Sequence, residues 1–371
     1  DASVLAGTQG YRNHHKKDRI FELAARQRLP VVLFAEGGGG RPGDVDVPVI
    51  AGLDTRAFEL FAGLSGLVPT VGIASGFCFA GNAALLGCCD VVIATEGASI
   101  GMGGPAMVEG GGLGTFAPEE IGPLAVQVAN GVVDVAVADE AEAVAVAKRY
   151  LAYFQGPVAP GPVPDQAALR DVVPEARRTV YEVRRAIEGL ADEGSVLELR
   201  RGYGTAVVTA LVRLAGRAVG VLANDPAVLG GAVDAAAADK AARFLQLCDG
   251  HDLPVLTLCD TPGFLVGPSA EEQAQVRRFA RLFVVGASLT VLHRVRARLI
   301  DAGGAGLHTK SAEFSVNDLR HEPDLHYIVW TVTTPDAQLR ALTDAGFNAH
   351  YLLHEQLPQL AAAYAQDARH N

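Results

Sequence analysis

Runs of apolar residues alternate along this chain with amphipathic segments, and this alternation predicts an α/β layer fold. The expected strands, at residues 30–35, 68–74 and 90–95, are nearly continuous in apolar residues, as is typical of parallel strands buried on both faces. Amphipathic or alanine-rich spacing predicts helices at residues 16–28, 53–66, 80–87, 117–130 and 138–153.

One part of this pattern occurs twice. The segment at residues 29–38 reappears at 253–263, so the two copies lie 224 positions apart (29 to 253). Each copy reads as a helix, a buried strand, an acidic residue and a Gly/Pro turn, and the same offset pairs Lys16 with Lys240. A period this long indicates two homologous domains rather than short stacked repeats. Ligand sites often lie between such domains.

The Pro/Gly run at residues 156–164 cannot continue a helix and predicts a linker. A helix at 175–191, strands at 205–213 and 217–223 and a helix at 235–249 then lead to the second copy. From about residue 292 arginine and histidine become frequent and the repeat disappears; a strand at 329–332 and helices near 335–345 and 354–365 are expected there. The predicted organisation is a first half at 1–155, a linker and helix at 156–194, a second half at 195–291 and a divergent tail at 292–371.

Composition narrows the functional classes. A formal charge of −11 argues against nucleic-acid binding, and the absence of long apolar runs argues against a membrane span. The five cysteines have no zinc-ligand spacing, so we expect no metal, buried thiols and a reducing, cytoplasmic location. Because the chain opens on Asp1 and its first residues resemble the middle of a domain, we expect an upstream part to be missing.

Glycine-rich turns after the strands are the strongest candidates for chemistry. Residues 75–84 join a strand to a helix, and the free N–H groups at a helix start suit a developing oxyanion such as a thioester enolate. Close helix–strand packing also calls for small residues, so both interpretations stay open. The same holds for the turns at 36–41 and 101–114. Glu36 and Asp260 occupy matching repeat positions, which suggests a carboxylate pair as a further hypothesis.

Four motifs together resemble one family. VLAGTQG at residues 4–10, FAEGG at 34–38, GFCFAGN at 76–82 and CDTPGF at 259–264 are similar to the biotin-dependent acyl-CoA carboxyltransferases of the β-subunit type. The resemblance covers about residues 1–291. It implies two tandem crotonase-like (ClpP/crotonase) domains, each a β-β-α superhelix, with the second one incomplete.

The resemblance implies that this chain is the carboxyltransferase component of an acyl-CoA carboxylase. Such a component moves a carboxyl group from carboxybiotin to the α-carbon of an acyl-CoA through a thioester enolate held in a backbone oxyanion hole. The implied cofactor is biotin on a carrier protein or domain. The implied partners are a biotin carboxylase, the biotin carboxyl carrier and further copies of this chain, because the family's site is shared between protomers.

The resemblance also assigns residues. Ala80 and Gly81 match the enolate oxyanion hole, although the family often has Gly-Gly there. The acyl-CoA side would be lined by Gly7, Thr8, Lys16, Gly38, Gly39, Gly103, Gly104 and Pro105. The biotin side would be shaped by Asp260, Pro262, Gly263 and Phe264.

The family's second oxyanion hole has no clear counterpart. Its glycines would fall at residues 303–306, but the charged run at 292–301 replaces the expected buried strand, in which unpaired arginines are costly. Loss of that hole predicts acyl-CoA binding with impaired carboxyl transfer. Two alternatives therefore remain at this point: a biotin-dependent acyl-CoA decarboxylase of the same fold, and an inactive scaffold subunit.

Overall fold

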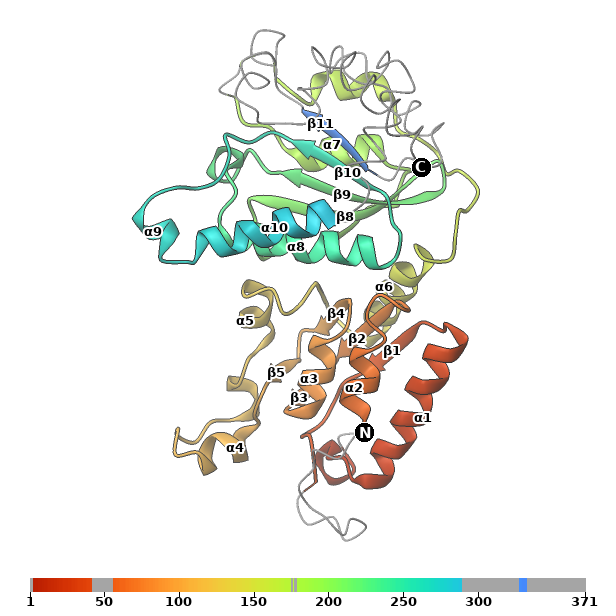
Figure 1. Ribbon diagram of the computed structural model, residues 1–371, viewed down its shortest axis with the longest axis vertical. Coiled ribbons are helices and arrows are strands. Elements are labelled where there is room, and N and C mark those ends of the chain that lie inside the picture. Colours follow the sequence, from red (N-terminus) through yellow and green to blue (C-terminus); the bar gives the residue numbers. More distant parts are fainter. Residues whose placement is uncertain (1–2, 42–55, 175, 177–178, 289–326, 332–371) are drawn as a thin grey trace, which may run out of the picture. The chain divides into compact units, whose positions relative to one another are not determined.

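The structure is a computed structural model that describes residues 3–41, 56–174, 176, 179–288 and 327–331. The chain divides into two compact units (Figure 1). Unit 1 comprises Asp1–Gln155 with Arg200–Tyr203, and unit 2 comprises Gly156–Leu199 with Gly204–Asn371. The mixed α/β architecture expected from the sequence is present in both units.

Unit 1 contains a parallel sheet with the strand order β1-β2-β4-β6. Its strands are β1 (Val31–Phe34), β2 (Thr70–Ala74), β4 (Val91–Thr95) and β6 (Val135–Val137). Every residue of β2 and β4 is buried, which explains their uninterrupted apolar sequences. The first three strands were expected from the sequence, whereas β6 was not.

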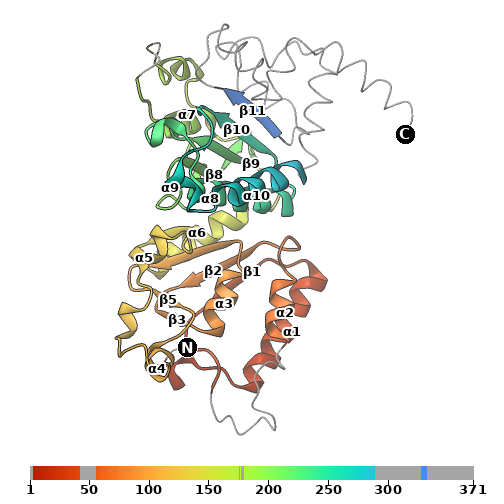
Figure 2. The ribbon, with the colours of Figure 1, turned by 60° about the vertical axis from the view of Figure 1, so that its left-hand side comes forward.

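Helices cover both faces of this sheet. On one face lie α1 (Tyr11–Gln27), α2 (Ala57–Ala62) and α3 (Gly81–Gly87), and α6 (Glu140–Ala152) lies on the other (Figure 2). Beneath the first group, apolar side chains form a core that includes Phe21, Ala24, Phe61, Leu64 and Leu85. α6 begins at the N-cap Asp139, whose side chain accepts from the Glu142 N–H at 2.9 Å.

A second, two-stranded sheet in unit 1 joins β3 (Phe77–Phe79) to β5 (Ser99–Gly101) in parallel. The glycine-rich run after β5 contains the short helix α4 (Pro105–Gly110). The single helix expected at 117–130 is wrong. The chain forms a 3₁₀ turn at Pro118–Glu120, and α5 (Leu124–Ala129) starts only after Gly122, which has φ +64°, and Pro123, which has no N–H to donate.

Unit 2 contains a five-stranded sheet of order β11-β10-β9-β8-β7. β7 (Leu197–Leu199), β8 (Val207–Leu214) and β9 (Arg217–Asn224) are antiparallel neighbours, while β10 (Val255–Cys259) runs parallel to β9. The strand expected at 329–332 is found as β11 (Tyr327–Thr331), parallel to β10. The helices expected at 335–345 and 354–365, and the second oxyanion hole at 303–306, lie outside the described residues.

The faces of this sheet carry different helices. α8 (Ala235–Gly250) and α10 (Gln275–Ser288) lie side by side on one face, and α7 (Val183–Leu190) lies on the other (Figures 1 and 2). The short α9 (Pro268–Glu271) precedes α10. The helix expected at 175–191 is therefore too long, because the described residues before Val183 are not helical and Glu182 has extended backbone angles.

The cysteines differ in exposure. Cys78, Cys89 and Cys248 are buried and Cys259 is partly buried, but Cys88 is exposed, so the expectation that all five are buried is wrong for Cys88. It ends the last turn of α3, where that helix turns toward β4. Burial, with Glu36 nearby, raises the pKa of Cys78 to about 12.

Alkylation by iodoacetamide at pH 8 tests this difference. Because the thiolate is the reactive form and Cys78 is both buried and hard to ionise, we expect Cys88 to be modified at least about 100-fold faster than Cys78. Peptide mass spectrometry after timed quenching measures both rates. Comparable rates in the native protein would contradict the described fold, and the protein unfolded in urea provides the control in which all five react.

Candidate functional site

Three backbone segments of unit 1 meet where β1 ends. Parallel bridges join Gln9 to Gly40 and Gly37 to Cys78, so the turn after β1 is held on both sides. The Gln9 N–H donates to the Gly39 carbonyl at 2.7 Å, and the Gly37 N–H donates to the Phe77 carbonyl at 2.7 Å. The predicted acyl-CoA residues from the first two motifs therefore lie beside the predicted oxyanion turn.

Gly37 allows this close approach. Its φ is +111°, and a Cβ at this position would lie 2.4 Å from the Gly7 carbonyl oxygen. Any side chain would force the two backbones apart. Neighbouring Gly38 lies against Thr8, whose carbonyl accepts from the Arg41 guanidinium at 3.0 Å.

The turn that leads into α3 has unusual geometry. Ala80 has φ +53° and ψ −126°, a conformation that L residues rarely adopt. Its N–H donates to the Gly101 carbonyl at 3.1 Å, and its methyl group would lie 2.7 Å from a Cβ built on Gly39. The Gly81 N–H, at the first position of α3, has no hydrogen-bond partner among the described residues. Of the two N–H groups expected to bind the oxyanion, only that of Gly81 makes no hydrogen bond within the described residues.

A chain of polar side chains reaches this turn from α1. The Lys17 ammonium donates to the Gln9 side-chain oxygen, and the Gln9 amide donates to the Asn82 side-chain oxygen. Asn82, which is 4% exposed, donates in turn to the Glu36 carbonyl at 2.9 Å. Burial lowers the pKa of Lys17 to about 8. The sequence interpretation missed these three side chains and assigned Lys16, which is exposed on α1.

The remaining predicted acyl-CoA residues lie at the start of α4. A Cβ on Gly104 would lie 3.2 Å from the Phe79 ring, so this glycine packs directly against β3. Pro105 occupies the first turn of α4, and Gly103 precedes it beside Met107. The side chains of Met102 (71% exposed), Met107 and Leu113 are open to solvent.

The predicted biotin-side residues lie in unit 2, after β10. The Asp260 carboxylate accepts a hydrogen bond from the Tyr181 hydroxyl at 2.9 Å, and burial together with that carboxylate raises the pKa of Tyr181. A Cβ on Gly231 would lie 2.2 Å from the Asp260 carbonyl oxygen. Phe264 packs on Phe279 with ring centroids 3.9 Å apart.

The rest of this turn is more open: Pro262 is exposed, and the Gly263 N–H donates to the Thr261 hydroxyl at 3.0 Å.

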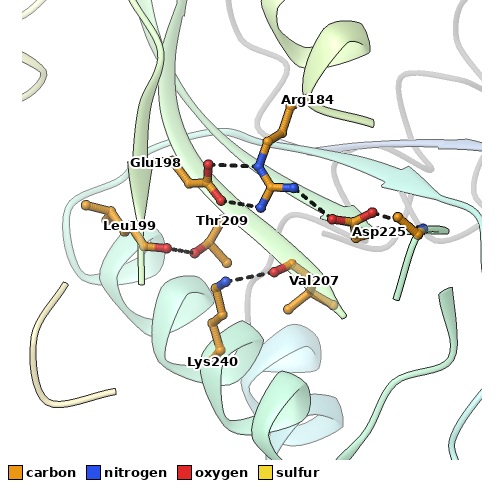
Figure 3. Close-up of polar contacts among 8 residues, drawn as sticks. Arg184, Glu198, Leu199, Val207, Thr209, Asp225 and Lys240 are labelled. Atoms are coloured by element: carbon orange, nitrogen blue, oxygen red, sulfur yellow. Dashed lines mark hydrogen bonds and ion pairs between the residues drawn. The ribbon is translucent and has the colours of Figure 1, made fainter. Parts of the chain in front are cut away.

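An ion-pair network fixes α7, the helix that begins two residues after Tyr181. Arg184 of α7 forms two hydrogen bonds with Glu198, at 2.7 and 3.0 Å, and one with Asp225 at 2.7 Å (Figure 3). Asp225 directly follows β9 and Glu198 belongs to β7, so one guanidinium ties α7 to two strands. Bidentate, charge-assisted geometry of this kind orients as well as stabilises.

The turns that precede α1 and α8 have matching geometry, and their residues lie 224 positions apart. Leu5–Gly7 and Leu229–Gly231 are both 3₁₀ turns, and all six of these residues have positive φ. The bridge between Gln9 and Gly40 corresponds to a bridge between Val233 and Phe264. Each unit therefore has its own version of the same turn, bridge, helix and strand.

Comparison with known proteins identifies the chain as a member of the carboxyl transferase domain family, whose model matches residues 1–290. The family resemblance deduced from the four motifs is thereby confirmed. Among the described residues no cluster of three His, Cys, Asp or Glu side chains could hold a metal ion, and no described helix is long and apolar enough to cross a membrane.

Three relatives show the extent of the similarity. The solved structure of a single-chain, multi-domain long-chain acyl-CoA carboxylase is 62% identical, with a TM-score of 0.75, over 78% of this chain and 29% of that one. The 12S subunit of methylmalonyl-CoA carboxyltransferase from Propionibacterium freudenreichii subsp. shermanii is 30% identical over 78% of this chain and 57% of the relative. Uncharacterized carboxylase YngE of Bacillus subtilis (strain 168) is 30% identical over 95% of this chain and 69% of its own length.

The last of these alignments bears on the tail. Because it covers 95% of the chain, it extends beyond residue 291, whereas the family model stops at residue 290. The expected divergence of the tail at 292–371 stays a prediction. The names of these relatives are those of carboxylases and a carboxyltransferase subunit, so the decarboxylase and scaffold alternatives gain no support from them.

Substitution of Gly37 tests the close approach around which the site is built. Gly37→Ala would place a methyl group against the Gly7 carbonyl and strain a positive φ, so we expect it to lower the free energy of unfolding by about 3 kcal/mol or more. Gly40→Ala is the matched control, since a Cβ there meets nothing within 4 Å, and should change stability by less than about 1 kcal/mol. Urea denaturation followed by circular dichroism measures both; equal effects would contradict the geometry.

Proposed function

We propose that this chain is the carboxyltransferase component of a biotin-dependent acyl-CoA carboxylase. Membership of the family supports the reaction type. The observation that carries the proposal is the turn before α3, where the Gly81 N–H has no partner within the described residues and the polar side chains of Gln9 and Asn82 lie just behind it. A developing oxyanion needs a fixed donor of this kind.

The proposed role of the turn is to stabilise the thioester enolate. Loss of the α-proton moves negative charge onto the thioester oxygen, and the Gly81 N–H would donate to that oxygen. Because the Ala80 N–H already donates to Gly101, we assign Ala80 chiefly to holding the turn. Carboxybiotin, when bound, would supply CO₂ by cleavage of the bond between its N1 atom and the carboxyl carbon, and the biotin so released would accept the α-proton. The enolate carbon would then form the new bond to the carbon of that CO₂.

The acyl-CoA and biotin sides are assigned to different units. Gly7, Thr8, Gly38, Gly39 and the start of α4 surround the oxyanion turn and would line the acyl-CoA side, with Lys16 exposed on α1 for the nucleotide end. Asp260, Pro262, Gly263 and Phe264 form the turn after β10 and would contact biotin. A carboxylate pair of Glu36 and Asp260 remains a hypothesis, because these residues belong to separate units.

We also propose that the two units are tandem crotonase-like domains with boundaries near residues 155, 194 and 291. The matched turns at Leu5–Gly7 and Leu229–Gly231 support this, as does the correspondence of α1 and β1 with α8 and β10. An incomplete second domain, and hence impaired transfer, is part of the same proposal.

The similarity to known relatives supports a proposal for the substrate and the partners. The 62% identity with a long-chain acyl-CoA carboxylase favours long-chain acyl-CoA as the substrate class to test first. The transcarboxylase 12S structure, 30% identical with a TM-score of 0.71, is described as a hexamer, which supports assembly of this chain with further copies around a shared site. We further propose a biotin carboxylase and a biotin carboxyl carrier as partners. The five free cysteines agree with a cytoplasmic location.

Calorimetry and turnover measured together test the proposed reaction. We expect the purified protein to bind a long-chain acyl-CoA, and to show biotin-dependent decarboxylation of a malonyl-type CoA if its second half is competent. Binding without turnover would mean that the acyl-CoA half is intact and the biotin half incomplete. Absence of both would refute the proposed function.

The biotin side has a separate test in Tyr181→Phe. This change deletes only the hydroxyl that donates to Asp260, so the carboxylate loses one hydrogen bond while the packing is retained. We expect the KM for biotin to rise about tenfold to hundredfold, since one hydrogen bond to a charged group contributes about 1.5–3 kcal/mol. The affinity for acyl-CoA, measured by calorimetry, should not change; a weakened acyl-CoA affinity would contradict the assignment of this turn to biotin.

A further inference from the structure

We propose that Lys17, Gln9 and Asn82 act as a positioning chain that fixes the Ala80–Gly81 turn for the thioester oxyanion, an inference that rests on the proposed function. None of these side chains is assigned to acyl-CoA or biotin above. They come from α1, from the segment before α1 and from the first turn of α3, respectively, and they are connected end to end by hydrogen bonds.

The donors and acceptors of this positioning chain can be ordered in only one direction. An ammonium group donates and cannot accept, so Lys17 requires the Gln9 oxygen on its side. The Gln9 amide nitrogen must then face Asn82, and the Asn82 amide nitrogen must face the Glu36 carbonyl. One cation at the end of the chain thus sets the orientation of two side-chain amides that could otherwise turn over.

The last member acts directly on the turn. Asn82 immediately follows Gly81 in α3 and is almost completely buried, so its side chain cannot exchange the Glu36 and Gln9 contacts for water without opening the unit. The Glu36 carbonyl belongs to the same turn as Gly37 and Gly39, and Gly39 lies against Ala80. The contacts of Asn82 therefore hold the Gly81 peptide in register with the turn after β1.

The backbone of Gln9 adds a second constraint. Its N–H donates to Gly39 and its carbonyl accepts from the Arg41 N–H at 2.9 Å, so its side chain projects from a fixed point. The Lys17 side chain is partly buried, whereas neighbouring Lys16 is exposed. A cation that only solubilised α1 would not need to be withdrawn and bound to an amide.

Replacement of the cation is the first test, using the full-length protein in the turnover and calorimetric assays. Lys17→Met keeps the aliphatic stem and removes the donor, so we expect kcat to fall about tenfold to hundredfold while the KM for acyl-CoA changes less than about threefold. Lys17→Arg keeps a permanent donor and should recover most of the loss. Lys148→Met, on the exposed surface of α6, removes the same charge elsewhere and should leave both constants unchanged.

The variant Gln9→Glu distinguishes an effect carried by the hydrogen bonds of the positioning chain from an effect of the Lys17 charge alone. A carboxylate would still pair with Lys17, but it cannot donate to the Asn82 oxygen. If Lys17 acts through the chain, Gln9→Glu should reduce kcat as strongly as Lys17→Met, and the double variant should be no worse than either single one. Normal kcat in Gln9→Glu, or losses that multiply in the double variant, would overturn the proposal.

A readout that needs no turnover keeps this test distinct from that of the proposed function. In ¹⁵N-resolved NMR spectra, the side-chain NH₂ signals of Gln9 and Asn82 and the Gly81 amide signal should all shift in Lys17→Met and stay in place in Lys148→Met. Unchanged Asn82 and Gly81 signals would overturn the positioning chain even in an active protein. If the signals shift in Lys17→Met but the wild-type protein binds no acyl-CoA, the result would support the positioning chain and refute the proposed function.

Discussion

The approach of the Gly37 backbone to the Gly7 carbonyl is the constraint on which the site in unit 1 depends. Without a side chain at position 37, the turn after β1 can lie between the segment that precedes α1 and strand β3. That contact brings together residues separated by about 70 positions of sequence, Gly7 and Phe77 among them. The carbonyl of Glu36, the side chain of Asn82 and the N–H of Gly81 are then placed by the backbone rather than by flexible side chains.

A comparable close approach of two backbones occurs in unit 2, although the position that corresponds to Gly37 is Thr261 there. Gly231 takes the position of Gly7, and its close partner is the carbonyl of Asp260 instead of a glycine turn. Where unit 1 places the side-chain amides of Gln9 and Asn82, unit 2 places the carboxylate of Asp260, which accepts from the Tyr181 hydroxyl. Tyr181 lies just before α7, the helix that Arg184 ties to Asp225. A shared backbone arrangement thus supports two different sets of polar groups.

Much of the fold could be predicted from the sequence, and the reasons for success and failure are physical. β2 and β4 are buried on both faces, so their apolar runs are unambiguous. β3, β5 and β7 have three residues each, too few for any periodicity to show. The family motifs located the turn proposed to hold the oxyanion, but they gave no sign of the contact between Lys17 and Gln9. That contact depends on which side of α1 faces Gln9, and it follows from the tertiary contacts of Gln9 rather than from the local sequence.

Ala80 and Gly39 show how the departure from the family pattern is accommodated. The family often has glycine at position 80, and a positive φ there disfavours alanine by about 1 kcal/mol or more. The methyl group of Ala80 occupies the space that a Cβ on Gly39 would need, 2.7 Å away, so only one of the two positions can carry a side chain. A Cβ on Gly39 would also lie 3.4 Å from the Gly81 nitrogen, so a side chain at position 39 would crowd both residues of the turn. The alanine therefore fills a packing space at the cost of backbone strain, and the Gly81 N–H proposed as the oxyanion donor still has no partner among the described residues.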